Sequence, residues 1–310
     1  LSCMQSESTA RTALLSGLID YAGLFPPESR DMAGAVEGYR DARALQSWMV
    51  DRFICPDDRL EELAAFLTDE PDPWPLAVVI SPPSGDWSKG IADYARSLAV
   101  VELAMRKGAR FSVAEIPIPS DLVDRPTLSA ILASVRTSLG ALFDTVLFEV
   151  SMAADWQRSL PLQMRSIFEA QAGAKIRCGG LAIEDFPAPE QVASFIALAA
   201  QSEIPFKATA GLHHPIRHWD CAPGVQRHGF LNIAGASVFA QALGLKVAEL
   251  AEVIAEEDPE AFELTDATFR WRHQVVTTSE IERARAGFML AYGSCSFTVP
   301  VNDLVELGML

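Results

Sequence analysis

The sequence predicts an α/β protein built as a single (β/α)8 TIM barrel with a C-terminal helical extension. Short apolar runs alternate with longer amphipathic runs along most of the chain, which is the pattern of repeated βα units. Seven or eight such units in about 240 residues favour a closed barrel over a doubly wound sheet. No Gly-x-Gly-x-x-Gly follows the first apolar run, so the main mark of a dinucleotide-binding sheet is missing.

The barrel strands are expected where short apolar runs lie between helical patterns. These runs are 17–22, 49–55, 76–81, 111–117, 144–150, 174–178 and 205–209. Helical periodicity fills the intervals at 31–47, 57–68, 86–106, 120–139, 154–172 and 188–203. The last of these helices shows clear start signals, because Pro189 and Glu190 stand in its first turn.

Two segments leave the strand count open. Residues 98–105 read either as the end of a helix or as the fourth strand, and 228–233 are the natural candidate for the eighth strand. On this basis residues 1–245 form the barrel, and residues 246–310 form helices and a tail that pack on it. No linker rich in Pro, Gly or Ser divides the chain, so we expect one barrel with an extension.

Composition restricts the partners. The formal net charge of −16 argues against nucleic acid or an anionic membrane as a general partner, and no run of about eighteen apolar residues predicts a membrane span. The five cysteines are scattered and odd in number, which suits a reducing compartment, and the start has no signal-peptide profile. We therefore expect a cytoplasmic protein that acts on a small molecule. A homo-oligomer remains an open option.

The scarcest ionisable residues gather in one part of the chain. Only five lysines are present, and Lys175 and Lys207 both fall inside predicted strands. Four of the five histidines (213, 214, 218 and 228) follow within a short stretch after the second of these strands. Charged side chains are seldom buried unless they are paired or used in function. Residues 174–232 therefore indicate an enzyme.

The two lysines predict carbonyl chemistry. Side chains alternate along a strand, so Lys175 and Arg177 share one face, and active sites of barrels lie at the carboxyl ends of the strands. An inward lysine beside a second cation is expected to have a lowered pKa and to attack a carbonyl carbon. Glu149, and with it Glu115, would move protons. In the alternative interpretation one lysine points outward, or both pair with carboxylates such as Glu149.

A resemblance supports the first interpretation. Lys175-Ile-Arg-Cys-Gly-Gly, followed 32 residues later by Lys207-Ala-Thr-Ala-Gly-Leu, resembles the two lysine strands of deoxyribose-phosphate aldolases and related Schiff-base barrels over residues 174–212. The resemblance implies that Lys175 forms the imine and Lys207 tunes its pKa. It also implies that the small-residue turns at 179–180 and 210–211 bind a substrate anion. Arg177 and Cys178 replace hydroxyl residues of that family, and the His-His-Pro at 213–215 has no counterpart there.

The histidines support a rival chemistry. His213 or His214 would act as acid or base near neutral pH in the lysine mechanism. Alternatively, the cluster from His213 to His228 would hold a divalent ion with Glu149 in a metal-dependent lyase or hydrolase. The spacing matches no metal motif, so no metal ligand is assigned. A third possibility is a barrel that binds a small molecule without catalysis.

The sequence thus predicts an aldolase-like lyase that acts on a small oxo-acid or sugar-like carbonyl compound through a lysine imine, without a cofactor. The predicted catalytic residues are Lys175, Lys207, Glu149, His213 and His214. The predicted substrate-binding residues are Arg177, Cys178, Gly179, Gly180, Gly211, Arg217, His228, Asn232 and Ser294.

Overall fold

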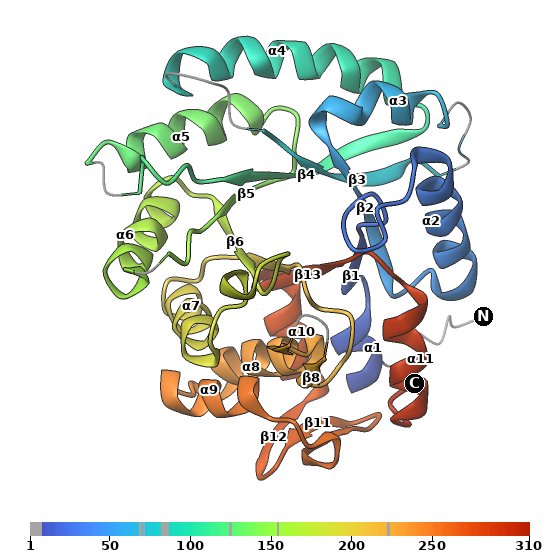
Figure 1. The fold of residues 1–310 in the computed structure, drawn as a ribbon, viewed down its shortest axis with the longest axis vertical. Coiled ribbons are helices and arrows are strands. Elements are labelled where there is room, and N and C mark those ends of the chain that lie inside the picture. Colours follow the sequence, from blue (N-terminus) through green and yellow to red (C-terminus); the bar gives the residue numbers. More distant parts are fainter. Residues whose placement is uncertain are drawn as a thin grey trace, which may run out of the picture.

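The centre of the protein is a closed barrel of eight parallel strands. A computed structural model describes residues 8–67, 70, 72–81, 87–123, 126–153, 155–221 and 224–310. The barrel order is β1-β13-β7-β6-β5-β4-β3-β2 (Figure 1). These strands are β1 (Ile19–Tyr21), β2 (Val50–Pro56), β3 (Trp74–Val79), β4 (Ala109–Pro117), β5 (Thr145–Glu149), β6 (Gly173–Arg177), β7 (Phe206–Thr209) and β13 (Met289–Ser294). The predicted (β/α)8 TIM barrel with C-terminal additions is confirmed.

Helices surround the barrel and connect most of its strands (Figure 1). They are α1 (Ala10–Leu15), α2 (Met32–Gln46), α3 (Leu60–Ala64), α4 (Trp87–Met105), α5 (Leu128–Leu139), α6 (Trp156–Glu169), α7 (Pro189–Gln201), α8 (Phe230–Leu243), α9 (Val247–Ala255), α10 (Thr278–Gly287) and α11 (Thr298–Glu306). Residues 98–105 belong to α4, so the fourth strand is the run that ends near Pro117. Within the part of the chain that the structure describes, no helix has the length and apolar character of a membrane span.

The predicted eighth strand is wrong. Residues 228–233 lead into α8, which is buried from Phe230 to Ala240 and contains only two polar side chains in that stretch, Asn232 and Ser237. Such a helix has no solvent-exposed polar face, so its first residues look like a buried strand. The barrel closes instead through β13, which pairs with β7 and with β1. Residues 246–310, predicted only as an extension, thus supply the last barrel strand.

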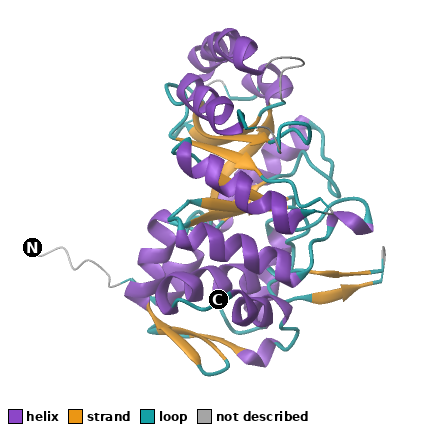
Figure 2. Cartoon of the chain, turned by 90° about the vertical axis from the view of Figure 1, so that its left-hand side faces the viewer, coloured by secondary structure: helices purple, strands orange, loops and turns teal. Residues whose placement is uncertain are grey.

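Two small antiparallel sheets are added to the barrel. The hairpin of β8 (His218–Asp220) and β9 (Val225–Arg227) follows β7 and projects from the body of the molecule (Figure 2). The sheet of β10 (Phe262–Leu264), β11 (Thr268–Trp271) and β12 (Gln274–Thr277) lies beyond α8 and α10. The hairpin follows the barrel strand β7, at the end of the barrel where active-site loops are found in this fold.

The apolar core has two layers. The larger cluster lies between the strands and the helices. A small separate cluster lies inside the barrel and contains Ala22, Ile54, Ala77, Val113 and Leu147. Alternate residues of each strand point to these two layers. Because the inner cluster is small, much of the barrel interior is taken by charged side chains from β1, β2 and β4 to β7.

Candidate active site

Lys175 and Lys207 lie side by side in the barrel interior. They are register partners on the neighbouring strands β6 and β7. Their ammonium groups share the carboxylate of Glu115 from β4, with Lys175 Nζ 2.6 Å from Oε2 and Lys207 Nζ 2.5 Å from Oε1. Both lysines are almost fully buried. The expected adjacency of the two amines inside the barrel is therefore present, with a carboxylate between them.

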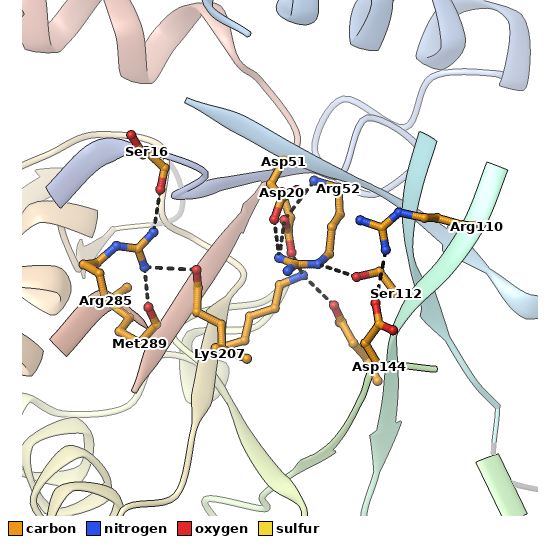
Figure 3. A network of polar contacts seen from close by, with 12 residues as sticks. Ser16, Asp20, Asp51, Arg52, Arg110, Ser112, Asp144, Lys207, Arg285 and Met289 are labelled. Carbon is orange, nitrogen blue, oxygen red and sulfur yellow. Dashed lines mark hydrogen bonds and ion pairs between the residues drawn. The ribbon is translucent and has the colours of Figure 1, made fainter. Parts of the chain in front are cut away.

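The charges continue as an alternating chain across the barrel. Lys207 also donates to Asp20 on β1, whose other oxygen lies 3.3 Å from Arg52 Nη1 on β2 (Figure 3). At the other end, Lys175 Nζ lies 3.0 Å from Glu149 Oε2 on β5. We call the six residues Arg52, Asp20, Lys207, Glu115, Lys175 and Glu149 the ion chain. Its cations and anions alternate, so the buried charges compensate one another.

The pKa values in the ion chain correct one expectation. Burial alone would raise the pKa of Glu115, but Lys175 and Lys207 outweigh it and lower this pKa to about 2. Burial alone would lower the pKa of Lys175, but Glu115 and Glu149 outweigh it and raise this pKa. The predicted lowering of the Lys175 pKa by its cationic neighbour is therefore wrong. The alternative interpretation, in which both lysines pair with carboxylates, describes the resting state.

Lys175 is the less tightly held of the two lysines. Lys207 is 1% exposed and donates hydrogen bonds to both Asp20 and Glu115. Lys175 is 5% exposed, and its partner Glu149 has a side chain that is 15% exposed. At the Lys175 end of the ion chain, both the lysine and its partner Glu149 are therefore more exposed than Lys207.

A cavity of about 380 Å³ opens at this end, at the carboxyl ends of β4, β5 and β6. Glu149 and Arg177 line it, together with Glu184, Asp185 and Gln191. The exposed Arg177 follows Lys175 on the same face of β6, as the alternation predicts. In the described part of the chain Arg177 forms no ion pair, so its guanidinium is free for an anionic group.

Close packing requires glycine at two turn positions after β6, and the turn after β7 also contains a glycine. A Cβ on Gly180 would lie 2.2 Å from the Asp185 carboxylate, which accepts the backbone N–H groups of Leu181 and Ala182. Gly179 packs on Phe186, and Gly211 has a left-handed backbone with φ +75°. Cys178 is fully buried, and burial raises the pKa of its thiol to about 12. These residues shape the rim of the barrel, and no described contact tests their role in binding substrate.

Arg217, His228 and Asn232 hold the loop between β7 and α8. Asn232 Nδ2 donates to the carbonyls of Val253 and Glu256, and its Oδ1 accepts the Arg217 backbone N–H. His228 contacts the Pro187 carbonyl through Nε2 and accepts from Arg217 Nη1 at Nδ1. Burial lowers the pKa of His228 to about 4. Ser294, at the end of β13, donates to the Ser296 carbonyl at 2.6 Å.

The other histidines surround a second cavity of about 430 Å³, which we call the histidine pocket. It lies after β7, β13 and β1 and is lined by Pro27, Glu28, His213, His214, His218, Trp219, Asp220, Cys221, Arg227, Cys295, Ser296 and Val299. His214 Nδ1 lies 2.6 Å from Asp303 on α11, and His213 Nδ1 lies 3.7 Å from the Cys295 sulfur. Within the described ranges, no three His, Cys, Asp or Glu side chains are arranged to hold a metal ion.

Arg52 enters the ion chain without having been predicted as a site residue, and Asp20 was expected to reach the pocket but was not among the predicted catalytic or binding residues. Asp20 is a carboxylate within the apolar run 17–22, and Arg52 is a guanidinium within the run 49–55. A charge at an inward position of a predicted strand is the signal that both share. Glu115 carries the same signal, and Cys295 carries none because its partner His213 is 82 residues away.

The fold and the ion chain define a TIM barrel with a charged interior that is open at the carboxyl ends of its strands. This fold mostly carries enzymes, with the reacting groups at that end. No protein-family model matches the chain, and no curated protein matches it. The reaction must therefore be inferred from the site itself.

Proposed function

We propose that this protein is an aldolase-type lyase that binds a small oxo-acid or sugar-like carbonyl compound as an imine on Lys175. The main support for this proposal is the position of Lys175 in the barrel. It stands next to Lys207 on the neighbouring strand, and it borders the cavity through Glu149. Lysine on adjacent strands at this end of a barrel also agrees with the resemblance to deoxyribose-phosphate aldolases.

Glu149 is the proposed proton carrier. Lys175 is an ammonium at rest, so it must lose a proton before its nitrogen can attack a carbonyl carbon. Glu149 Oε2, 3.0 Å away, accepts that proton. After the attack a second proton passes from the nitrogen to the carbonyl oxygen, which becomes the carbinolamine hydroxyl. Glu149 then gives the first proton to this hydroxyl, which leaves as water. The resulting iminium takes up the electron pair of the carbon–carbon bond that breaks.

Lys207 has a different role from the one that the sequence suggested. It keeps Glu115 ionised, because it donates to that carboxylate and contributes to its low pKa. When Lys175 gives up its proton, the remaining charges of Lys207 and Glu115 still compensate each other inside the barrel. Lys207 therefore acts as a positioning residue that stabilises the chain while the neighbouring amine reacts.

Arg177 is the proposed partner of the substrate carboxylate. Its guanidinium lines the same cavity as Glu149 and projects from the same strand face as Lys175. A guanidinium binds a carboxylate through two parallel hydrogen bonds, which fixes the orientation of a planar oxo-acid. This favours a 2-oxo acid over a neutral sugar.

Borohydride trapping tests the proposal. The full chain is incubated with a panel of 2-oxo acids and small aldehydes, reduced, and digested for peptide mass spectrometry. We expect a reduced adduct on Lys175, its loss in Lys175→Arg, and adduct formation slowed roughly 100-fold in Glu149→Gln. Lys246→Arg, the same change at an exposed lysine, is the matched control. A compound that is turned over without any adduct on Lys175 would refute the imine.

A further inference from the structure

The histidine pocket contains a pair of reactive groups that the lysine mechanism leaves unused. Cys295 follows β13 and His213 follows β7, and these two strands are neighbours in the barrel. The pair thus meets at the carboxyl ends of the strands, where barrel enzymes place their reacting groups. Both residues line the cavity of about 430 Å³, which shares no lining residue with the cavity beside Glu149.

The contact has the geometry of a nucleophile and its base. The Cys295 sulfur lies 3.7 Å from His213 Nδ1, within reach of a hydrogen bond to sulfur. Burial lowers the pKa of His213 to about 4, so the ring is neutral at pH 7 and can accept a proton. Burial also raises the pKa of the Cys295 thiol. The resting pair is therefore a thiol and a neutral imidazole, and the proton moves only when sulfur attacks.

We propose that Cys295 and His213 form a second reactive centre that adds a small aldehyde reversibly as a hemithioacetal. The sulfur bonds to the carbonyl carbon while the carbon–oxygen π bond breaks. The thiol proton passes to His213 Nδ1 and from there to the carbonyl oxygen, which becomes a hydroxyl. One base serves both transfers. The step needs no leaving group and no redox partner.

The lining fits such a ligand. It combines apolar surface with several polar side chains, and among these Ser296, His218 and Arg227 are able to contact an oxygen atom of a small molecule. The Arg227 guanidinium is fixed, because it pairs with Asp220 and lies 5.2 Å from the centre of the Phe186 ring. A fixed pocket orients a small aldehyde toward the sulfur at little entropic cost.

Alkylation kinetics test the pair in the full chain. Iodoacetamide is added at pH 7.5, and the modification of each cysteine is followed by peptide mass spectrometry with and without propionaldehyde. We expect Cys295, which is 4% exposed at the wall of the pocket, to react faster than the fully buried Cys55 and Cys178, and propionaldehyde to protect it. His213→Gln should slow alkylation of Cys295 at least about tenfold. His273→Gln, the same change at an exposed histidine, is the matched control and should leave the rate as it is.

The outcomes separate this proposal from the imine on Lys175. Protection of Cys295 by propionaldehyde should persist in Lys175→Arg, which cannot form the imine. A borohydride adduct on Lys175 should likewise persist in Cys295→Ser. If the wild-type protein shows no protection of Cys295, the hemithioacetal is refuted without any variant. An unchanged alkylation rate in a folded His213→Gln protein would refute the role of the base.

Discussion

The ion chain and the histidine pocket bury ionisable groups in opposite ways. In the ion chain each lysine has two carboxylate partners, and both Lys175 and Glu115 keep their charges although they are buried. In the histidine pocket His213 has a thiol as its neighbour, and burial holds it neutral with a pKa of about 4. Burial removes charge from an unpaired group, and a close partner of opposite charge restores it.

This difference assigns the two clusters different chemical capacities. A charged, paired amine is stable but must lose a proton before it reacts, so Lys175 depends on Glu149. A neutral imidazole carries a free lone pair, so in the proposed second centre His213 can accept the hydrogen of the thiol without first losing a proton. Two kinds of experiment test this difference. One removes a charged partner from the ion chain, and the other follows stability as the groups of both clusters titrate.

The largest effect is expected from removing the shared carboxylate. Glu115→Gln leaves two buried ammonium groups with one fewer anion between them, so it should lower the free energy of unfolding by about 3–5 kcal/mol. Urea denaturation at pH 7 measures this change. Glu282→Gln, at an exposed position on α10, should stay within about 0.5 kcal/mol of the wild type. A similar small effect for Glu115→Gln would show that the ion chain does not stabilise the fold.

The second largest effect is a loss of stability at acidic pH, when Glu115 takes up a proton. The folded-state pKa of Glu115 is about 2, below its ordinary value of 4.5. Ionised Glu115 therefore adds on the order of 3 kcal/mol to the free energy of unfolding. This stabilisation is fully present above about pH 4.5 and is lost as pH falls toward 2. Denaturation at a series of pH values should show this slope in the wild type. The slope should be reduced in Glu115→Gln, and an identical slope in both proteins would contradict the assignment.

The buried histidines lose their contribution at a higher pH. The pKa of His228 falls from 6.5 to about 4 on burial, so the unfolded chain takes up this proton first. The free energy of unfolding is therefore unaffected by this proton above about pH 6.5. It falls by on the order of 3 kcal/mol as pH drops from 6.5 to 4. His228→Gln should flatten the stability curve in this window only. Ring-nitrogen NMR should find His228 neutral at pH 5.5, and a charged ring there would contradict the prediction.

The smallest effect belongs to the half-exposed pair of His214 and Asp303. Their side chains are 45% and 25% exposed, so solvent screens the 2.6 Å contact between Nδ1 and Oδ2. Asp303→Asn should lower the free energy of unfolding by about 0.5 kcal/mol. The same urea titration measures it. A loss comparable to that of Glu115→Gln would mean that exposure does not distinguish the two kinds of pair.

Seven of the barrel strands were predicted from the sequence close to their observed positions, because alternation and apolar runs are local signals. The eighth was not. β13 (Met289–Ser294) contains Gly293 and follows directly after α10, whereas the start of α8 is apolar at three of its first four residues, with Asn232 as the exception. A helix buried on all sides and a buried strand have the same composition, so the sequence favoured the wrong segment.

In the site, too, the features that depend on local sequence signals were predicted, and the features that depend on distant segments were not. Lys175 and Arg177 on one face, and Lys175 beside Lys207, followed from strand periodicity and from consecutive strands being neighbours. Which carboxylates face these lysines depends on β1, β4 and β5, whose inward residues meet only when the barrel closes. The pKa of Lys175 was therefore predicted with the wrong sign, since the sequence showed the lysine neighbour but not that Glu115 and Glu149 both lie beside Lys175.

The order of residues by itself determined a (β/α)8 barrel and a pair of lysines on adjacent strands. Those features depend on the period of side chains along a strand, which a short window of residues already contains. Only the tertiary structure decided that Glu115 lies between the lysines, that Cys295 meets His213, and that β13 closes the barrel. Each of these depends on segments that are distant along the chain, and their contact distances set which groups keep a charge.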